Sequence, residues 1–106
     1  MTQRLINMIE LHICESIILF YDKQAKINSF SSMSKFCTYY SNFILNPVNG
    51  SGFNTAMNLQ LSAIEYIHAI YGFSDDDAYP LVYNFFKNKR WLELEDISRY
   101  MLKIHG

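Results

Sequence analysis

Apolar residues recur every three or four positions over most of this chain, which is the spacing of one face of an α-helix. Between residues 4 and 22 this face consists of Ile6, Ile9, Ile13, Ile17 and Phe20. Leu5, Leu11, Ile18 and Leu19 widen the apolar face beyond the usual stripe. The pattern therefore predicts a first helix that is buried on two sides.

A second helical face follows a polar segment over residues 23–31, in which Asn28 favours a turn. Its apolar positions are Met33, Phe36, Cys37, Tyr40, Phe43 and Ile44. Ser31 or Ser32 can cap its N-terminus with a hydroxyl oxygen. We expect this helix to end before Pro47, because the residue that precedes a proline avoids the helical conformation.

Residues 46–52 predict a loop, since three of the seven are Gly or Pro. Asn54 or Thr55 can then cap a third helix. The apolar face of that helix consists of Met57, Leu61, Ile64, Ile67 and Tyr71. Gly72 follows at the position where a left-handed C-terminal cap is expected.

Proline sets the predicted register of the fourth helix. With Asp77 as the N-cap, Pro80 is the third helical residue, where its missing N–H has no helical partner. The apolar residues Leu81, Val82, Phe85 and Phe86 continue this helix to about Lys89. A fifth helix begins near Trp91 and has the apolar residues Leu94, Ile97, Met101 and Ile104.

Five helices with short connections predict a compact all-α bundle that forms a single domain over residues 1–106. The competing interpretation is an α+β fold in which residues 15–21 form a strand, because Ile17 to Tyr21 is a continuous apolar run. The length of the surrounding helical pattern favours the helix.

Composition excludes a disordered chain and disfavours nucleic-acid binding. The hydrophobic fraction is 50%, which is ample for a core. The formal net charge is -1, so there is no basic excess to hold a phosphate backbone.

Residues 36–64 carry no charge, but their polar residues exclude a membrane span. Because Glu10, His12 and Glu15 interrupt the apolar region that a signal peptide needs, we expect a cytoplasmic protein.

The residues capable of chemistry do not assemble into a complete site in the sequence. Glu65-x-x-His68 has the spacing of a di-iron bundle motif, but such a site needs a second motif and two further carboxylates. Cys14 and Cys37 match no zinc spacing and fall on apolar faces, where a thiol stays protonated and inert. We therefore expect no enzyme activity, no metal and no cofactor.

Aromatic and acidic residues indicate a binding protein instead. The chain has 8 Tyr, 8 Phe and 1 Trp, more aromatic mass than a core of this size needs. Tyr and Trp suit surfaces that become buried when a partner docks. Acidic groups begin the fourth and fifth helices, and together they would form one acidic surface rimmed by aromatic side chains. The predicted partner-binding residues are Asp75, Asp76, Tyr79, Tyr83, Trp91, Glu93, Glu95 and Asp96.

The alternative for these carboxylates is a pair of ordinary helix starts, in which acidic side chains offset the positive end of the helix dipole. On that interpretation they are solvated and bind nothing.

One segment carries a resemblance to a known family. Asn54-Thr55-Ala56-Met57-Asn58-Leu59-Gln60-Leu61, followed by the apolar Ile64 and Ile67, resembles the helix of the TomB-type antitoxins, the partners of the Hha nucleoid modulator. In size the chain is also similar to the small bacterial immunity proteins found beside contact-dependent toxin domains. Both resemblances imply a protein that neutralises a toxin by binding it, and neither transfers a site residue.

We therefore expect a non-enzymatic immunity protein or antitoxin. A cationic nuclease is the most economical target, because a carboxylate patch can mimic the phosphates that a nuclease binds. The alternatives are a phage or plasmid anti-defence or adaptor protein that binds a bacterial assembly, and a self-associating module that uses Tyr39, Tyr40 and Phe43. A metalloenzyme is the remaining class.

Overall fold

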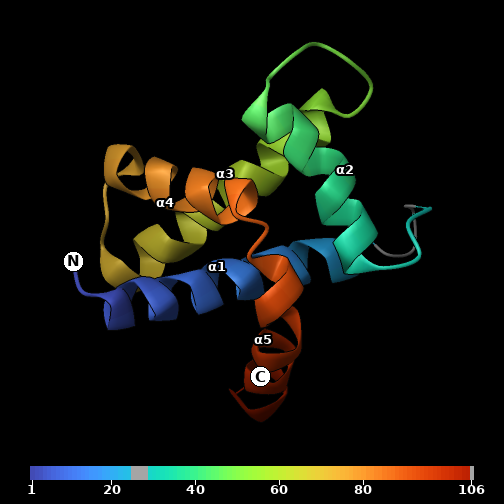
Figure 1. The fold of residues 1–106 in the computed structure, drawn as a ribbon. Coiled ribbons are helices and arrows are strands. Elements are labelled where there is room, and N and C mark those ends of the chain that lie inside the picture. The colour runs from blue at the N-terminus through green and yellow to red at the C-terminus, as the bar shows by residue number, and fades with distance from the viewer. Residues whose placement is uncertain (25–28, 106) are drawn as a thin grey trace.

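Five helices make up the part of the chain that the computed structural model describes, residues 1–24 and 29–105 (Figure 1). They are α1 (Gln3–Gln24), α2 (Met33–Leu45), α3 (Phe53–Tyr71), α4 (Asp75–Lys87) and α5 (Trp91–His105). No strand forms among these described residues, so the all-α prediction is confirmed. The alternative strand over residues 15–21 is wrong, because that segment lies within the long helical pattern of α1.

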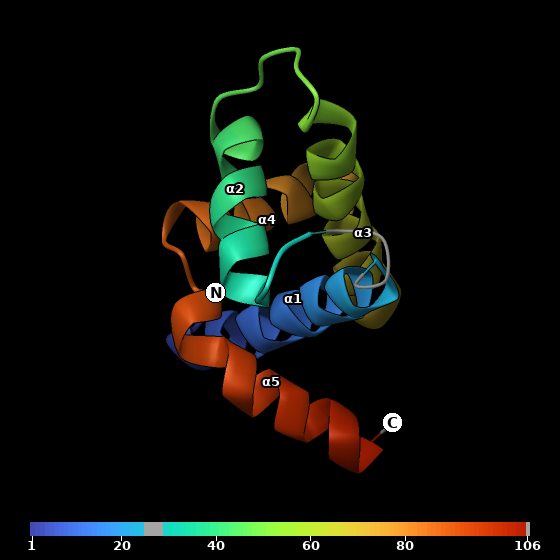
Figure 2. The same cartoon turned by 90° about the vertical axis from the view of Figure 1, so that its right-hand side faces the viewer.

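Helix α1 is buried on two sides, as its broad apolar face predicts. Residues 13–18 are consecutive and all buried. At 3.6 residues per turn, six successive side chains point all round the helix axis, so no single covered side could bury them. Helices α2, α3 and α4 lie on one side of α1 and α5 lies on the other (Figures 1 and 2).

One hydrophobic core joins the five helices. Around the isoleucines of α1 it contains Phe36 from α2, Leu59 from α3, Phe85 from α4 and Trp91 from α5, each at most 1% exposed. Full burial of an aliphatic or phenyl side chain of this size stabilises the fold by about 1.5–3 kcal/mol. The core therefore depends on contacts between helices that are far apart in the sequence.

Aromatic residues supply much of this core. The ring of Phe36 has its centroid 4.7–6.2 Å from those of Phe20, Tyr21, Phe30 and Tyr40. Such spacing is typical of favourable aromatic pairs. Most of the aromatic side chains, which composition alone suggests exceed the needs of a core, therefore lie in the core or pack against it.

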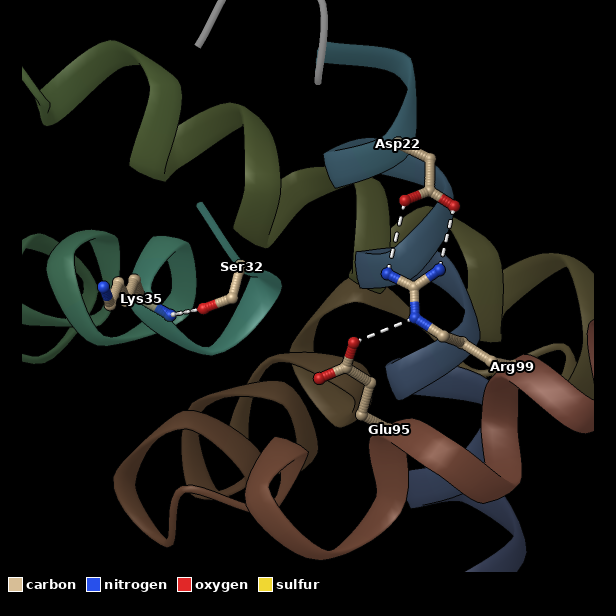
Figure 3. Close-up of polar contacts among 5 residues, drawn as sticks. All are labelled: Asp22, Ser32, Lys35, Glu95 and Arg99. Atoms are coloured by element: carbon tan, nitrogen blue, oxygen red, sulfur yellow. Dashed lines mark hydrogen bonds and ion pairs between the residues drawn. The ribbon is translucent and has the colours of Figure 1, made fainter. Parts of the chain in front are cut away.

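Several helix ends follow their predicted signals. Ser32 caps α2, since its Oγ accepts a hydrogen bond from the backbone N–H of Lys35 at 3.2 Å (Figure 3). Helix α2 ends before Pro47. Gly72 ends α3 with a φ of 75°, a left-handed conformation that costs glycine little because it has no Cβ. The predicted turn at Asn28 lies outside the described residues.

The start of α3 differs from the prediction. Gly52 occupies the N-cap position, in place of Asn54 or Thr55. A Cβ at Gly52 would lie 2.7 Å from the ring of Phe43. The loop therefore packs closely on α2 and leads directly into α3, and this packing, rather than a side-chain cap, sets where the helix begins.

The start of α4 also differs from the prediction. Ser74 rather than Asp77 is the N-cap, because the Oγ of Ser74 accepts a hydrogen bond from the N–H of Asp77 at 3.2 Å. Pro80 is consequently the sixth helical residue and not the third. Its missing N–H leaves the carbonyl of Asp76 without a helical donor. Asp76 is exposed, so water can satisfy that carbonyl.

A left-handed residue turns the chain between α4 and α5. Lys89 has a φ of 51°, although it is not a glycine. Its N–H donates to the carbonyl of Phe86, and the N–H of Arg90 donates to the carbonyl of Phe85. These two bonds close a Schellman motif. Helix α4 therefore ends at Lys87, slightly before the predicted end, and α5 leaves in a new direction across α1.

Replacing Ser74 by alanine should lower the free energy of unfolding by about 0.5–2 kcal/mol, because α4 loses its capping hydroxyl. Asp77→Ala should cost less, about 0.3–1 kcal/mol, since Asp77 only offsets the helix dipole. Urea unfolding followed by circular dichroism measures both. A larger loss for Asp77→Ala than for Ser74→Ala would show that the cap is assigned to the wrong residue.

Candidate binding surface

The structure separates the two acidic groups that the sequence suggested would form one surface. Helix α5 begins just after α4 ends, so its acidic start lies at the opposite end of α4 from Asp75 and Asp76 (Figure 1). Helix α4 has 13 residues. At a rise of 1.5 Å per residue α4 is roughly 20 Å long, and this length lies between the two groups. The prediction of one continuous acidic surface is therefore wrong.

Trp91 is not available as an anchor for a partner. Its side chain is 1% exposed, and its ring centroid lies 6.1 Å from that of Phe86 in the core. Trp91 lies on the same side of α5 as Leu94 and Ser98, and Ser98 is buried as well. The prediction that Trp91 rims a binding surface is therefore also wrong.

Arg90 holds one of the carboxylates at the start of α5. Its Nη1 donates to Oε2 of Glu93 at 2.7 Å, and its Nε donates to Oε2 of Glu10 on α1 at 3.1 Å. The hydrogen bond to Glu93 raises the pKa of the Arg90 guanidinium. Glu93 therefore already has a cationic partner within the molecule.

Arg99 holds a second carboxylate of this group. Its Nε donates to Oε2 of Glu95 at 2.9 Å, and its two Nη atoms donate to the carboxylate of Asp22 on α1 at 3.2 and 3.3 Å (Figure 3). These bonds tie α5 to the C-terminal part of α1. Asp96 is exposed and is the member of the group that lies outside these arginine pairs.

The four predicted residues of α4 do lie together. Asp75, Asp76, Tyr79 and Tyr83 occupy one side of the helix, and we call them the acidic α4 face. The rings of Tyr79 and Tyr83 stack with centroids 6.1 Å apart, and Tyr79 is 47% exposed. Within the described part of the chain, neither Asp75 nor Asp76 enters an ion pair. Their charges are thus free to act outward.

Helix α5 exposes an apolar surface that the sequence pattern did not predict. Ile97, Tyr100 and Ile104 are 51%, 64% and 56% exposed. Their spacing places them on one side of the helix, and we call them the α5 stripe. Helix α5 packs on α1, and its C-terminal end projects away from the other helices (Figure 2). Periodicity marks Ile97 and Ile104 as core positions, but the direction in which α5 crosses α1 leaves them outside.

A cleft of about 420 Å³ opens next to the α5 stripe, between α1, α3 and α5. Its lining residues are Met8, His12, Glu15, Tyr66, Ile70, Met101, Leu102 and His105. Half of them are apolar, and the polar ones include one carboxylate. We call this feature the Glu15 cleft.

Short polar contacts connect three residues of the Glu15 cleft, which are His12, Glu15 and Tyr66. The Oη of Tyr66 donates to Oε1 of Glu15 at 3.3 Å, and Nε2 of His12 lies 3.9 Å from the same oxygen. Nδ1 of His12 lies 2.6 Å from the Oη of Tyr71. Burial and the nearby charge of Glu15 raise the pKa of the Tyr66 phenol, which therefore stays a hydrogen-bond donor.

A second cavity, of about 520 Å³, lies between α1 and α4. Glu10 and Arg90 both line it and neutralise each other through their 3.1 Å hydrogen bond. Its walls otherwise combine isoleucines of α1 with uncharged amides such as Asn84 and Asn88. This cavity consequently offers a ligand no unbalanced charge.

The cysteines and His68, which the sequence offers as candidates for chemistry, lie in surroundings that do not form a reactive site. Cys14 and Cys37 are free and buried, and burial raises the pKa of Cys14 to about 11 and that of Cys37 further. Nδ1 of His68 lies 2.6 Å from the carbonyl oxygen of Phe73, just beyond the end of α3. Across residues 1–24 and 29–105, no three His, Cys, Asp or Glu side chains are grouped so that they could hold a metal ion.

Comparison with protein-family models, with curated proteins and with solved structures finds no match to this chain. None of the described helices is long and apolar enough to span a membrane.

The free energy of unfolding should fall as the pH rises from about 9 toward 11. An unfolded cysteine loses its proton near its ordinary pKa of 9.0, whereas folded Cys14 keeps its proton up to about 11. In this window the unfolded state binds fewer protons, so stability decreases with pH. Urea unfolding at successive pH values measures the slope. The double variant Cys14→Ala, Cys37→Ala should show a shallower decline, and an unchanged decline would contradict the assignment to cysteine.

Proposed function

We propose that the protein is a non-enzymatic inhibitor that neutralises a cationic protein toxin by binding it, as immunity proteins and antitoxins do. The α5 stripe is the observation that carries this proposal. Contiguous exposed apolar side chains on a small protein mark interaction sites. Tyr100, the most exposed residue of the stripe, belongs to a residue type that often dominates binding energy.

The exposed carboxylates support a cationic partner. Within residues 1–24 and 29–105, Asp75 and Asp76 have no ion-pair partner, so their field extends into solvent. An acidic surface accelerates the approach of a basic one and selects against acidic partners. Nucleases are basic where they hold phosphates, and a nuclease toxin is thus the target that best fits this charge. We assign steering to the acidic α4 face and anchoring to the α5 stripe.

Self-association is a second candidate, because the α5 stripe could also pair with its own copy across a two-fold axis. Size-exclusion chromatography with light scattering separates the two. A monomer supports the inhibitor, whereas a dimer that Ile97→Asp dissociates supports self-association. An anti-defence or adaptor protein would use the same kind of surface, and its target would be a bacterial assembly rather than a toxin.

A growth assay tests the proposed function. The candidate toxin is the product of the reading frame next to the one that encodes this chain. Co-expression of the chain should restore growth, and the double variant Ile97→Asp, Tyr100→Ala should bind at least about tenfold more weakly and rescue poorly, since such anchors contribute roughly 2 kcal/mol or more. Calorimetry of the purified pair measures the affinity.

Val48→Asp is the matched control for this assay. Val48 is 53% exposed and belongs to the segment between α2 and α3. Figure 1 shows that this loop lies on the far side of the molecule from α5. This variant should bind and rescue like the unmodified chain. Full rescue by the stripe variant would show that the α5 stripe is not the interface, and a neighbouring product without toxicity would overturn the proposal.

The steering role of the acidic α4 face gives a kinetic prediction. Asp75→Asn with Asp76→Asn should slow association with the toxin and weaken its salt dependence, because the field that attracts the partner is reduced. The fold should remain, since Ser74 keeps the cap of α4. Surface plasmon resonance at several salt concentrations measures the rates. Glu93→Gln, at a carboxylate already paired with Arg90, should change them less. Unchanged rates in the double variant would leave these aspartates as a solvated helix start.

A further inference from the structure

Glu15 is a buried carboxylate that lines an open cleft. Its side chain is 8% exposed, yet it forms part of the cleft wall. Removing a carboxylate from water costs several kcal/mol unless a cation and hydrogen bonds compensate. A buried carboxylate in the wall of an open cleft therefore suggests that a bound cation completes its surroundings.

The described part of the chain supplies little compensation. Tyr66 donates one hydrogen bond to Oε1 of Glu15, and His12 forms an ion pair with it only when the imidazole is protonated. Among the described residues, no lysine or arginine comes within 4.0 Å of Glu15. When His12 is neutral, the carboxylate of Glu15 therefore has no cationic neighbour at that range among residues 1–24 and 29–105.

We propose that the Glu15 cleft binds the ammonium group of a lysine side chain presented by the protein partner. The inference rests on the proposed function for the source of that lysine. A lysine combines a flexible apolar stem with a compact charge, so its methylenes can lie along apolar walls while the ammonium group reaches a carboxylate. Met8, Ile70 and Met101 provide such walls, and methionine side chains adapt readily to an occupant.

The hydrogen bonding of Glu15 favours lysine over arginine. A guanidinium binds a carboxylate best through two parallel hydrogen bonds, which use both oxygens. Oε1 of Glu15 already accepts from Tyr66, so a single charged donor fits the remaining oxygen better.

The position of the cleft favours a lysine that is part of a protein. Met101 and His105 of the cleft are next to Tyr100 and Ile104 of the α5 stripe in the sequence of α5. A partner that covers the stripe would thus bring its side chains to the mouth of the cleft. A buried charge pair beside an apolar patch is the arrangement expected of an interface anchor.

Nuclear magnetic resonance titration of the whole chain tests the proposal with two blocked amino acids. The probes are N-acetyl-lysine N′-methylamide and N-acetyl-norleucine N′-methylamide, which differ by the ammonium group. At pH 8, where imidazoles are ordinarily neutral, the lysine probe should bind about tenfold more tightly than the norleucine probe, as expected for a hydrogen bond to a charged group. The resonances of Tyr66 and Met101 should shift.

Glu15→Gln should abolish the preference for lysine, because glutamine keeps the shape and removes the charge. Glu65→Gln, an exposed carboxylate one residue before Tyr66 and outside the cleft, should retain it. Ile70→Trp changes a cleft residue that is 46% exposed, so it should weaken both probes without requiring the core to adjust. This third variant tests the cleft even where Glu15→Gln does not fold.

Three results would overturn the inference. Equal affinities for the two probes would show that Glu15 does not recognise an ammonium group. Shifts confined to the acidic α4 face would show that the probe only pairs with surface carboxylates. A blocked arginine that binds more tightly than the lysine probe would replace the assigned occupant. Because the probes do not involve the toxin, a failed growth assay with a positive titration would refute the proposed function and leave the cleft assignment in place.

Discussion

The enclosure of α1 is the constraint to which the other helices conform. Because residues 13–18 are all buried, α1 needs cover on both sides, and α5 has to lie opposite α2, α3 and α4. Enclosure also buries polar side chains of that segment, including Glu15 and Ser16. The ion pairs of Arg90 and Arg99 with α1 are partly exposed, so they orient α5 more than they stabilise it.

The position of α5 then determines the surfaces on which function depends. The left-handed Lys89 ends α4 and sends α5 across α1, so only one side of α5 is covered. Trp91 enters the core, while Ile97 and Ile104 remain outside. The same crossing leaves a space between three helices, with the carboxylate of Glu15 in its wall. One turn between helices thus creates both an exposed apolar stripe and the cleft beside it.

The sequence by itself determined the number and order of the helices and several of their ends. A three-and-four apolar spacing depends on neighbours within one helix, and a cap or a proline acts within one turn, so these signals are local. Ser32, Pro47 and Gly72 each act where the sequence predicts. At the start of α4 the local signals were ambiguous, because Ser74 and the aspartates that follow all offer a capping oxygen. The backbone N–H of Asp77 bonds to Ser74, and that choice became visible only in the folded chain.

Only the tertiary structure decided which surfaces are buried and which residues meet. An apolar stripe shows that a helix has a buried side but not how a neighbour crosses it, so periodicity could not place Trp91 inside and Ile97 outside. The direction of α5 follows from the backbone conformation of Lys89, which composition does not specify. Glu15 and Tyr66 are 51 residues apart, and their hydrogen bond exists because α1 and α3 pack together. Contacts of this kind depend on the packing of whole helices, and no local pattern encodes them.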